Sequence, residues 1–275
     1  MSRRWTEIEP SWIGAACHTG LVRPSTSVAF SGGTPPGAPA LTRLPAVVAS
    51  AVVVAALAGL NVADHLMRTG SLWLGPIAAV ALLLFARRSG LSWAQLGLGR
   101  DRVRSGGLWA LAAITVVATL YLVGVLLPST RTAFLDARYH LGLSGALVSA
   151  FVVIPFGTIL LEEVAFRSVL WAMLARHATT WRVLLTSSVL FGLWHVLPSM
   201  HLVSANRGVN TAVHGAGASA TLLVVAGTVV FTALGGVVAG ELRRRSGSLL
   251  ASAGMHWATN SLGVLFGLLA WHLAG

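Results

Sequence analysis

The sequence predicts an all-α integral membrane protein, a polytopic bundle of about seven transmembrane helices with its N-terminus on the cytoplasmic side. Only 10% of the 275 residues are charged and 55% are hydrophobic, whereas about 25% of the residues in a soluble domain are charged. From Leu44 onward, apolar runs follow one another that are long enough to cross a bilayer, which takes about 20 helical residues. The net charge of +11 does not indicate a nucleic-acid partner, because the arginines cluster in the short gaps between these runs.

The first 43 residues differ in composition from the rest of the chain. They are rich in proline and arginine and contain a Gly32–Gly33 pair, and they lack the apolar run that a secretory signal requires. We expect residues 1–43 to form a mobile cytoplasmic tail and residues 44–275 to form the membrane domain. Cys17 is the single cysteine, which excludes an internal disulfide framework.

The membrane domain divides into seven apolar runs. They cover about residues 44–62, 71–86, 107–127, 144–166, 183–200, 219–240 and 247–273. The second run is short for a span, and Pro155 within the fourth is expected to kink its helix. With the N-terminus inside, fifteen of the nineteen basic residues, all arginine, fall on the cytoplasmic side, as the positive-inside rule requires. This arginine-rich, lysine-free composition is typical of a bacterial plasma-membrane protein.

Two adjacent carboxylates lie inside the fourth run. A carboxylate buried in a membrane is costly unless it is paired, protonated or hydrated, so Glu162 and Glu163 mark a functional site by default. Glu163 and Arg167 are four residues apart on one helix face and can form a structural ion pair. Glu162 points about 100° away from Glu163 and has no such local partner.

Histidines and an asparagine supply further polar groups within the spans. His195 lies in the fifth run, and His256 and Asn260 lie four residues apart in the seventh. We expect these side chains to meet Glu162 around one hydrated cavity. A carboxylate and imidazoles could together activate water for hydrolysis, or Glu162, His195 and His256 could ligate zinc that activates the water.

Three motifs in chain order resemble the signature of the CPBP family of intramembrane proteases, which includes CAAX prenyl endopeptidases, bacteriocin-processing proteins and lysostaphin-resistance-A-like proteins. The motifs are Glu162-Glu163-x-x-x-Arg167, Phe191-x-x-x-His195 and His256-x-x-x-Asn260. The resemblance covers about residues 90–270 and implies an α-helical intramembrane endopeptidase. It implies that Glu162 and His195 activate water and that His256 and Asn260 stabilise the oxyanion. It assigns supporting places to Glu163, Arg167 and Phe191, and it leaves the need for a metal open.

The resemblance implies a membrane-associated protein or peptide as the substrate, and it does not fix the oligomeric state. One alternative is a non-catalytic family member with a role in bacteriocin immunity or envelope scaffolding. A proton-coupled carrier that uses Glu162 as a relay is a third interpretation, although the chain shows no internal repeat of the kind that carriers have. Counting 1.5 Å per residue along the spans places Glu162 and His256 in the inner half of the bilayer and His195 higher, so two of the three residues favour the inner half. This count predicts a cavity that opens to the cytoplasm, at the arginine-rich side.

Overall fold

A computed structural model describes residues 44–67 and 72–274 of the chain. All of these residues lie in one compact unit, Pro36–Gly275. The predicted all-α class is confirmed for them, since every regular element is a helix and the extended backbone pairs only in an isolated bridge between Asp136 and Asn206. The predicted tail, residues 1–43, lies outside the described residues.

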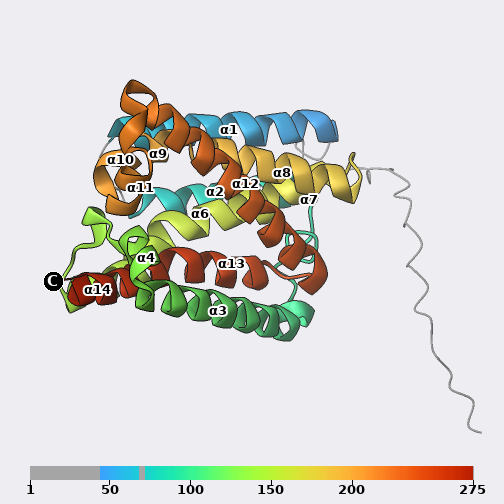
Figure 1. Cartoon of the computed structure of the whole chain (residues 1–275). Coiled ribbons are helices and arrows are strands. Elements are labelled where there is room, and N and C mark those ends of the chain that lie inside the picture. Colours follow the sequence, from blue (N-terminus) through green and yellow to red (C-terminus); the bar gives the residue numbers. More distant parts are fainter. Residues whose placement is uncertain (1–43, 68–71, 275) are drawn as a thin grey trace, which may run out of the picture. The chain divides into compact units, whose positions relative to one another are not determined.

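The long uninterrupted helices lie side by side (Figure 1). They are α1 (Ala46–Met67), α2 (Leu74–Arg88), α3 (Val103–Leu126), α8 (Thr180–Trp194) and α12 (Ala220–Ser246). Two further helical rods are interrupted by π-helical turns. The first contains α5 (Leu143–Val148), α6 (Leu160–Glu162) and α7 (Trp171–Leu174), and the second contains α13 (Leu249–Trp257) and α14 (Gly263–Ala274).

Short helical segments connect the rods. They are α4 (Pro128–Arg131), α9 (Val196–Ser199), α10 (Leu202–Ala205) and α11 (Arg207–Ala212), with 3-10 turns at Arg100–Arg102, Thr132–Phe134, Ala137–Tyr139 and His214–Ser219. Within the described residues, four helical stretches are long and apolar enough to cross a membrane by length and composition. They are Ala46–Ala63, Arg100–Leu126, Leu143–Leu174 and His214–Ser246. The molecule is therefore a helical membrane protein, and the count of seven spans remains a prediction.

The π-helical turns coincide with the sequence motifs. Glu163–Leu170 and Ala258–Leu262 are π-helical and contain Arg167 and Asn260 respectively. Pro155, where a kink was expected, begins a further π-helical turn, Pro155–Ile159. π-helical turns are rare in proteins and are frequent at functional sites.

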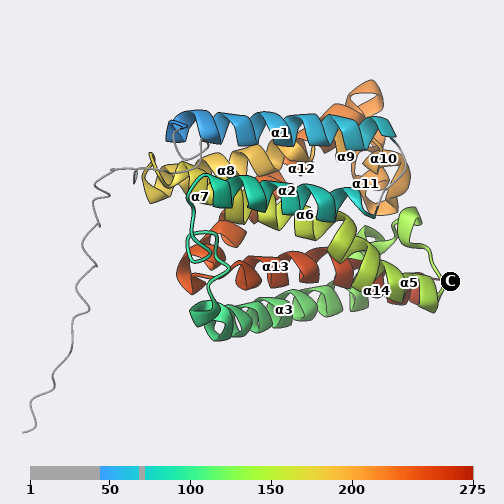
Figure 2. The ribbon, with the colours of Figure 1, turned by 180° about the vertical axis from the view of Figure 1, so that it is seen from behind.

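The helices place most arginines at one end of the bundle. The segments 87–104, 175–182 and 243–249 form what we call the arginine-rich end, and the segments 127–142 and 195–219 form the arginine-poor end (Figures 1 and 2). In Figure 1, α7 lies toward the arginine-rich end, and α4, α10 and α11 lie at the opposite end. The chain thus alternates between the two ends in the order that the sequence predicts for a polytopic bundle.

The loop after α2 closes the arginine-rich end. Arg243 of α12 is buried, and its guanidinium donates hydrogen bonds to the carbonyl oxygens of Gln95 at 3.0 Å and Arg167 at 3.2 Å. The hydroxyl of Ser168 donates to the carbonyl oxygen of Leu96 at 2.8 Å. These bonds tie the loop to two neighbouring helices directly beneath the motif residues.

Candidate active site

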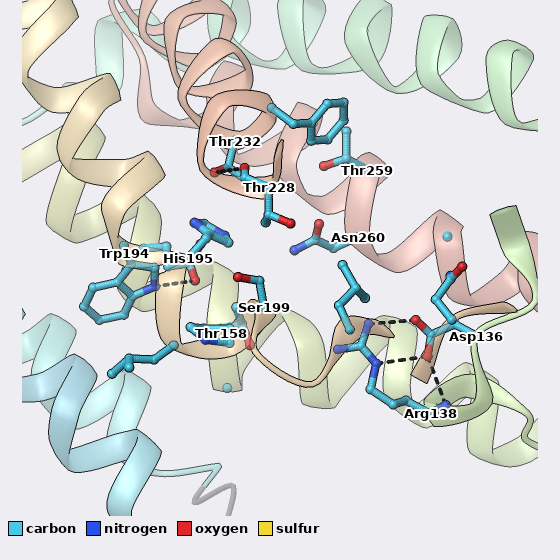
Figure 3. A pocket seen from close by; sticks show the side chains of 18 of the residues that line it. Asp136, Arg138, Thr158, Trp194, His195, Ser199, Thr228, Thr232, Thr259 and Asn260 are labelled. Carbon is cyan, nitrogen blue, oxygen red and sulfur yellow. Dashed lines mark hydrogen bonds and ion pairs between the residues drawn. The ribbon is translucent and has the colours of Figure 1, made fainter. Parts of the chain in front are cut away.

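A cavity of about 990 Å³ lies between the helices and is lined by three of the four predicted catalytic residues (Figure 3). Glu162, His195 and Asn260 all line it. They come from three different parts of the helical bundle, as expected if their side chains meet around one cavity. Further hydroxyl and amide groups share the wall. They include Asn61, Thr158, Ser199, Thr228, Thr232 and Thr259.

Only one oxygen of the Glu162 carboxylate accepts a hydrogen bond from the described residues. Its side chain is 6% exposed, and its Oε1 accepts a hydrogen bond of 2.9 Å from the indole Nε1 of Trp194. Its other oxygen, Oε2, has no hydrogen-bond partner among the described residues and lies 3.5 Å from Nε2 of His256. A buried carboxylate oxygen without a hydrogen-bond partner is costly.

Glu163 and Arg167 lie behind the cavity and not within it. The Glu163 Oε1 is 2.9 Å from Nδ1 of His256 and 3.8 Å from Nη1 of Arg167, and both side chains of the ion pair are almost fully buried. The guanidinium carbon of Arg167 lies 3.7 Å from the centre of the Phe191 ring, a cation–π contact. The expected Glu163–Arg167 pair is therefore present, with Phe191 as a third member.

His195 presents one ring nitrogen to the cavity. It follows directly after α8, and its Nδ1 lies 2.8 Å from the carbonyl oxygen of Phe191. A carbonyl can only accept, so this contact places the proton on Nδ1 and leaves Nε2 of the neutral ring with a free lone pair. Figure 3 shows His195 and Asn260 pointing into the same cavity from different helices.

His256 does not line the cavity, contrary to the expectation that all four predicted catalytic residues would do so. It is buried between the two glutamates, with Nδ1 facing Glu163 and Nε2 facing Glu162. Asn260, four residues later, faces the cavity because the helix turns π-helical at Ala258, where the spacing of a regular α-helix no longer holds. The contacts with Glu162 and Glu163 hold the His256 ring outside the cavity lining.

The donors do not fit the zinc site considered from the sequence. Among residues 44–67 and 72–274, no three His, Cys, Asp or Glu side chains are grouped to hold a metal ion. Nδ1 of His256 faces Glu163 and Nε2 faces Glu162, and the ring is not among the residues that line the cavity with His195.

The prediction that the cavity opens at the arginine-rich end is wrong. Its lining includes Phe134, Asp136 and Arg138 from one connecting segment and Leu202 and Asn206 from another, and both segments belong to the arginine-poor end. None of its lining residues comes from the loops of the arginine-rich end. The depth of a residue along its span does not by itself say at which end of the bundle a cavity opens, because that depends on how the connecting segments pack.

An ion pair lies where the cavity reaches the arginine-poor end. The Arg138 Nε and Nη2 donate to the two carboxylate oxygens of Asp136, at 2.9 and 2.7 Å (Figure 3). Burial alone would raise the pKa of Asp136, but the hydrogen bonds and charge of Arg138 lower it below its ordinary value. The amide of Asn206 donates to the carbonyl oxygen of Ala133 and joins the two segments of this end.

Sequence reasoning missed Trp194 and Asn61. Trp194 directly precedes His195, and a buried indole N–H usually requires a partner, which is the signal that could have singled it out. Asn61 donates from its Nδ2 to the carbonyl oxygen of Trp194 at 2.7 Å. A polar amide near the end of the first apolar run could likewise have been noticed.

One comparison with known proteins identifies the family. Residues 144–262 match the family described as type II CAAX prenyl endopeptidase Rce1-like. This stretch contains all three motifs and three of the helical rods that surround the cavity. Neither a curated protein nor a solved structure matches the chain. This match confirms the resemblance to the CPBP/CAAX family of intramembrane proteases that the sequence motifs indicate.

Proposed function

We propose that this protein is an intramembrane endopeptidase that hydrolyses peptide bonds of membrane-associated proteins or peptides. The observation that carries the proposal is the carboxylate of Glu162, which is buried on the wall of a large cavity with one oxygen unpartnered. The family match supports protease chemistry in general. A carboxylate so placed has the reach and the chemistry of a general base.

In this proposal, a water molecule in the cavity lies between the carboxylate of Glu162 and Nε2 of His195, since both residues line it. Glu162 accepts a proton as the water oxygen bonds to the carbonyl carbon of the scissile peptide. The resulting tetrahedral intermediate carries its negative charge on the former carbonyl oxygen. When the carbon–nitrogen bond breaks, the proton on Glu162 passes to the leaving amine, so that one water is consumed for each bond cleaved.

Asn260 is the donor that we assign to the oxyanion. Its side chain reaches the cavity, and an amide N–H is a suitable donor to a developing negative charge. His256 received this role from the family resemblance, but its ring is engaged by Glu162 and Glu163. We therefore assign it a positioning role, in which it links the base to the buried Glu163–Arg167 pair.

We further propose that the N-terminus is cytoplasmic and that α2, α8 and the α13–α14 rod complete a seven-span bundle. Helices α2 and α8 each have 15 residues, about 22 Å at 1.5 Å per residue, so the bilayer must be thin around them. The positive-inside rule places the arginine-rich end in the cytoplasm. Because the cavity reaches the opposite end, the substrate segment enters from the extracytoplasmic side, which argues against prenylated cytoplasmic proteins as substrates.

The proposed activity is tested by comparing membrane proteomes of cells that carry the wild type or Glu162→Gln. We expect new protein N-termini in the wild type that are absent in the variant. Glu241→Gln is the matched control, because the same change there affects an ion pair with Arg244 near the membrane surface. Identical proteomes for wild type and Glu162→Gln, with both proteins present at equal levels, would favour a non-catalytic family member.

The proposed orientation is tested separately, by labelling single cysteines with a membrane-impermeant thiol reagent in a chain that carries Cys17→Ser. Ala137→Cys lies at the exposed arginine-poor end and Thr179→Cys at the exposed arginine-rich end. We expect intact cells to be labelled at position 137 and inverted vesicles at position 179. The opposite pattern would place the mouth of the cavity in the cytoplasm.

A further inference from the structure

The proposed base accepts a single hydrogen bond within the described residues, and its donor is the side chain of Trp194. The indole Nε1 donates to Oε1 of Glu162 at 2.9 Å, and this is the one hydrogen bond that the carboxylate accepts within residues 44–67 and 72–274. Trp194 is the last residue of α8, directly before His195, and it lines the same cavity. The base and its proposed partner imidazole are thereby tied to one helix end.

Trp194 is itself held at two points, one on its backbone and one on its ring. The amide of Asn61 in α1 donates to the Trp194 carbonyl oxygen at 2.7 Å, which ties the end of α8 to α1. The ring of Phe166 meets the indole edge to face, with 5.7 Å between ring centres, a favourable aromatic arrangement. Both contacts restrict the position from which Nε1 reaches Glu162.

The chemistry of an indole suits this position. Indole N–H is a donor only and does not exchange roles with an acceptor, so it can fix Oε1 without taking up the proton that Glu162 must accept. With Oε1 bound by the indole, Oε2 lies beside the His256 ring, 3.5 Å from its Nε2. A side chain that could accept a proton would compete with the base instead of orienting it.

We infer that Trp194 is a positioning residue, which fixes the plane of the Glu162 carboxylate in the cavity wall for its reaction with the attacking water. This inference rests on the proposed hydrolase function. It predicts that removal of the indole N–H slows the chemical step and leaves substrate binding nearly unchanged, because the cavity wall keeps its shape.

The test replaces Trp194 by 3-benzothienylalanine, which has sulfur in place of the N–H and nearly the same shape. The probe is a synthetic peptide that spans a cleavage site found in the Glu162→Gln comparison. We expect kcat to fall about 10- to 100-fold, the scale of a small misplacement of a catalytic group, with KM within about twofold. The matched control carries the same analogue at Trp257, whose Nε1 donates to the carbonyl oxygen of Ala150 at 3.1 Å. There, kcat should stay unchanged.

A second measurement follows the indole ¹⁵N–¹H signals of the protein in detergent micelles. The Trp194 signal, identified by its absence in Trp194→Phe, should move in Glu162→Gln, while the Trp257 signal should not. Unchanged kcat with the analogue at position 194, or a raised KM alone, overturns the inference and makes Trp194 a wall residue. If the wild type cleaves no peptide, the proposed function fails and the inference falls with it. If Glu162→Gln is inactive and the analogue is fully active, only the inference fails.

Discussion

The buried pair of Glu163 and Arg167 offers a quantitative test of what holds the site together. Replacing Glu163 by Gln keeps an acceptor for His256 and leaves the Arg167 cation without a carboxylate. Breaking a buried ion pair in this way costs about 3–5 kcal/mol. The 3.8 Å separation and the lack of a hydrogen-bond partner for Nη1 of Arg167 favour the lower end of that range. For a chain of this size, about 3 kcal/mol corresponds to a fall in Tm of about 6–12 °C.

The assay is thermal unfolding of the purified protein in detergent, for the two single variants and the double variant. Arg167→Met alone should be destabilised to a similar degree, because it leaves Glu163 as a charge that only His256 balances. Glu163→Gln with Arg167→Met should recover at least half of the lost Tm, since neither charge is then left alone. Glu241→Gln, at a more exposed ion pair, should change Tm little. If the two single losses simply add in the double variant, the pair is not the stabilising unit.

Two further predictions concern helix packing and pH. A Cβ at Gly192 would lie 2.6 Å from the carbonyl oxygen of Val229, whereas one at Gly235 would meet nothing within 4 Å. Gly192→Ala should therefore push α8 away from α12 and lower the free energy of unfolding by about 1–3 kcal/mol. Gly235→Ala should leave Tm unchanged or higher. The pKa of Asp136 is lowered in the folded protein, so its bond to Arg138 stabilises the fold above the ordinary value of 3.8, and this contribution is lost as the pH falls through the folded value. Between pH 7 and pH 3 the wild type should lose more Tm than Asp136→Asn, and equal losses would contradict this role.

The sequence was sufficient to predict which polar groups gather. Glu162, His195 and Asn260 lie on separate apolar runs, and polar groups within a membrane require water or one another. That requirement alone brings them to one cavity, and it also predicts that Glu163 turns to Arg167. The helical class followed in the same way from the length and hydropathy of the runs.

The sequence could not predict the neighbours of these groups. His256 lies between two carboxylates because the wider turn at Ala258 alters its direction relative to Asn260, and no residue pattern marks such a turn. The bond from Trp194 to Glu162 joins residues 32 positions apart, and that between Asn61 and Trp194 joins residues 133 positions apart. Such contacts depend on how the helices pack, which hydrophobic periodicity does not determine.

The proposed orientation of the cavity rests on the distribution of the arginines between the two ends of the bundle. The structure shows which of these arginines are exposed and which are buried. Arg167 and Arg243 are buried and bound within the protein, so their position reflects packing and not the membrane potential. The exposed arginines are the ones on which the positive-inside rule acts. Within residues 44–67 and 72–274, the exposed arginines at the arginine-rich end are Arg87, Arg88, Arg100, Arg102, Arg104, Arg176, Arg182, Arg244 and Arg245, and those at the other end are Arg138 and Arg207. The asymmetry therefore persists when the buried arginines are left out. This asymmetry supports the orientation proposed above, in which the arginine-rich end is cytoplasmic and the cavity reaches the extracytoplasmic end.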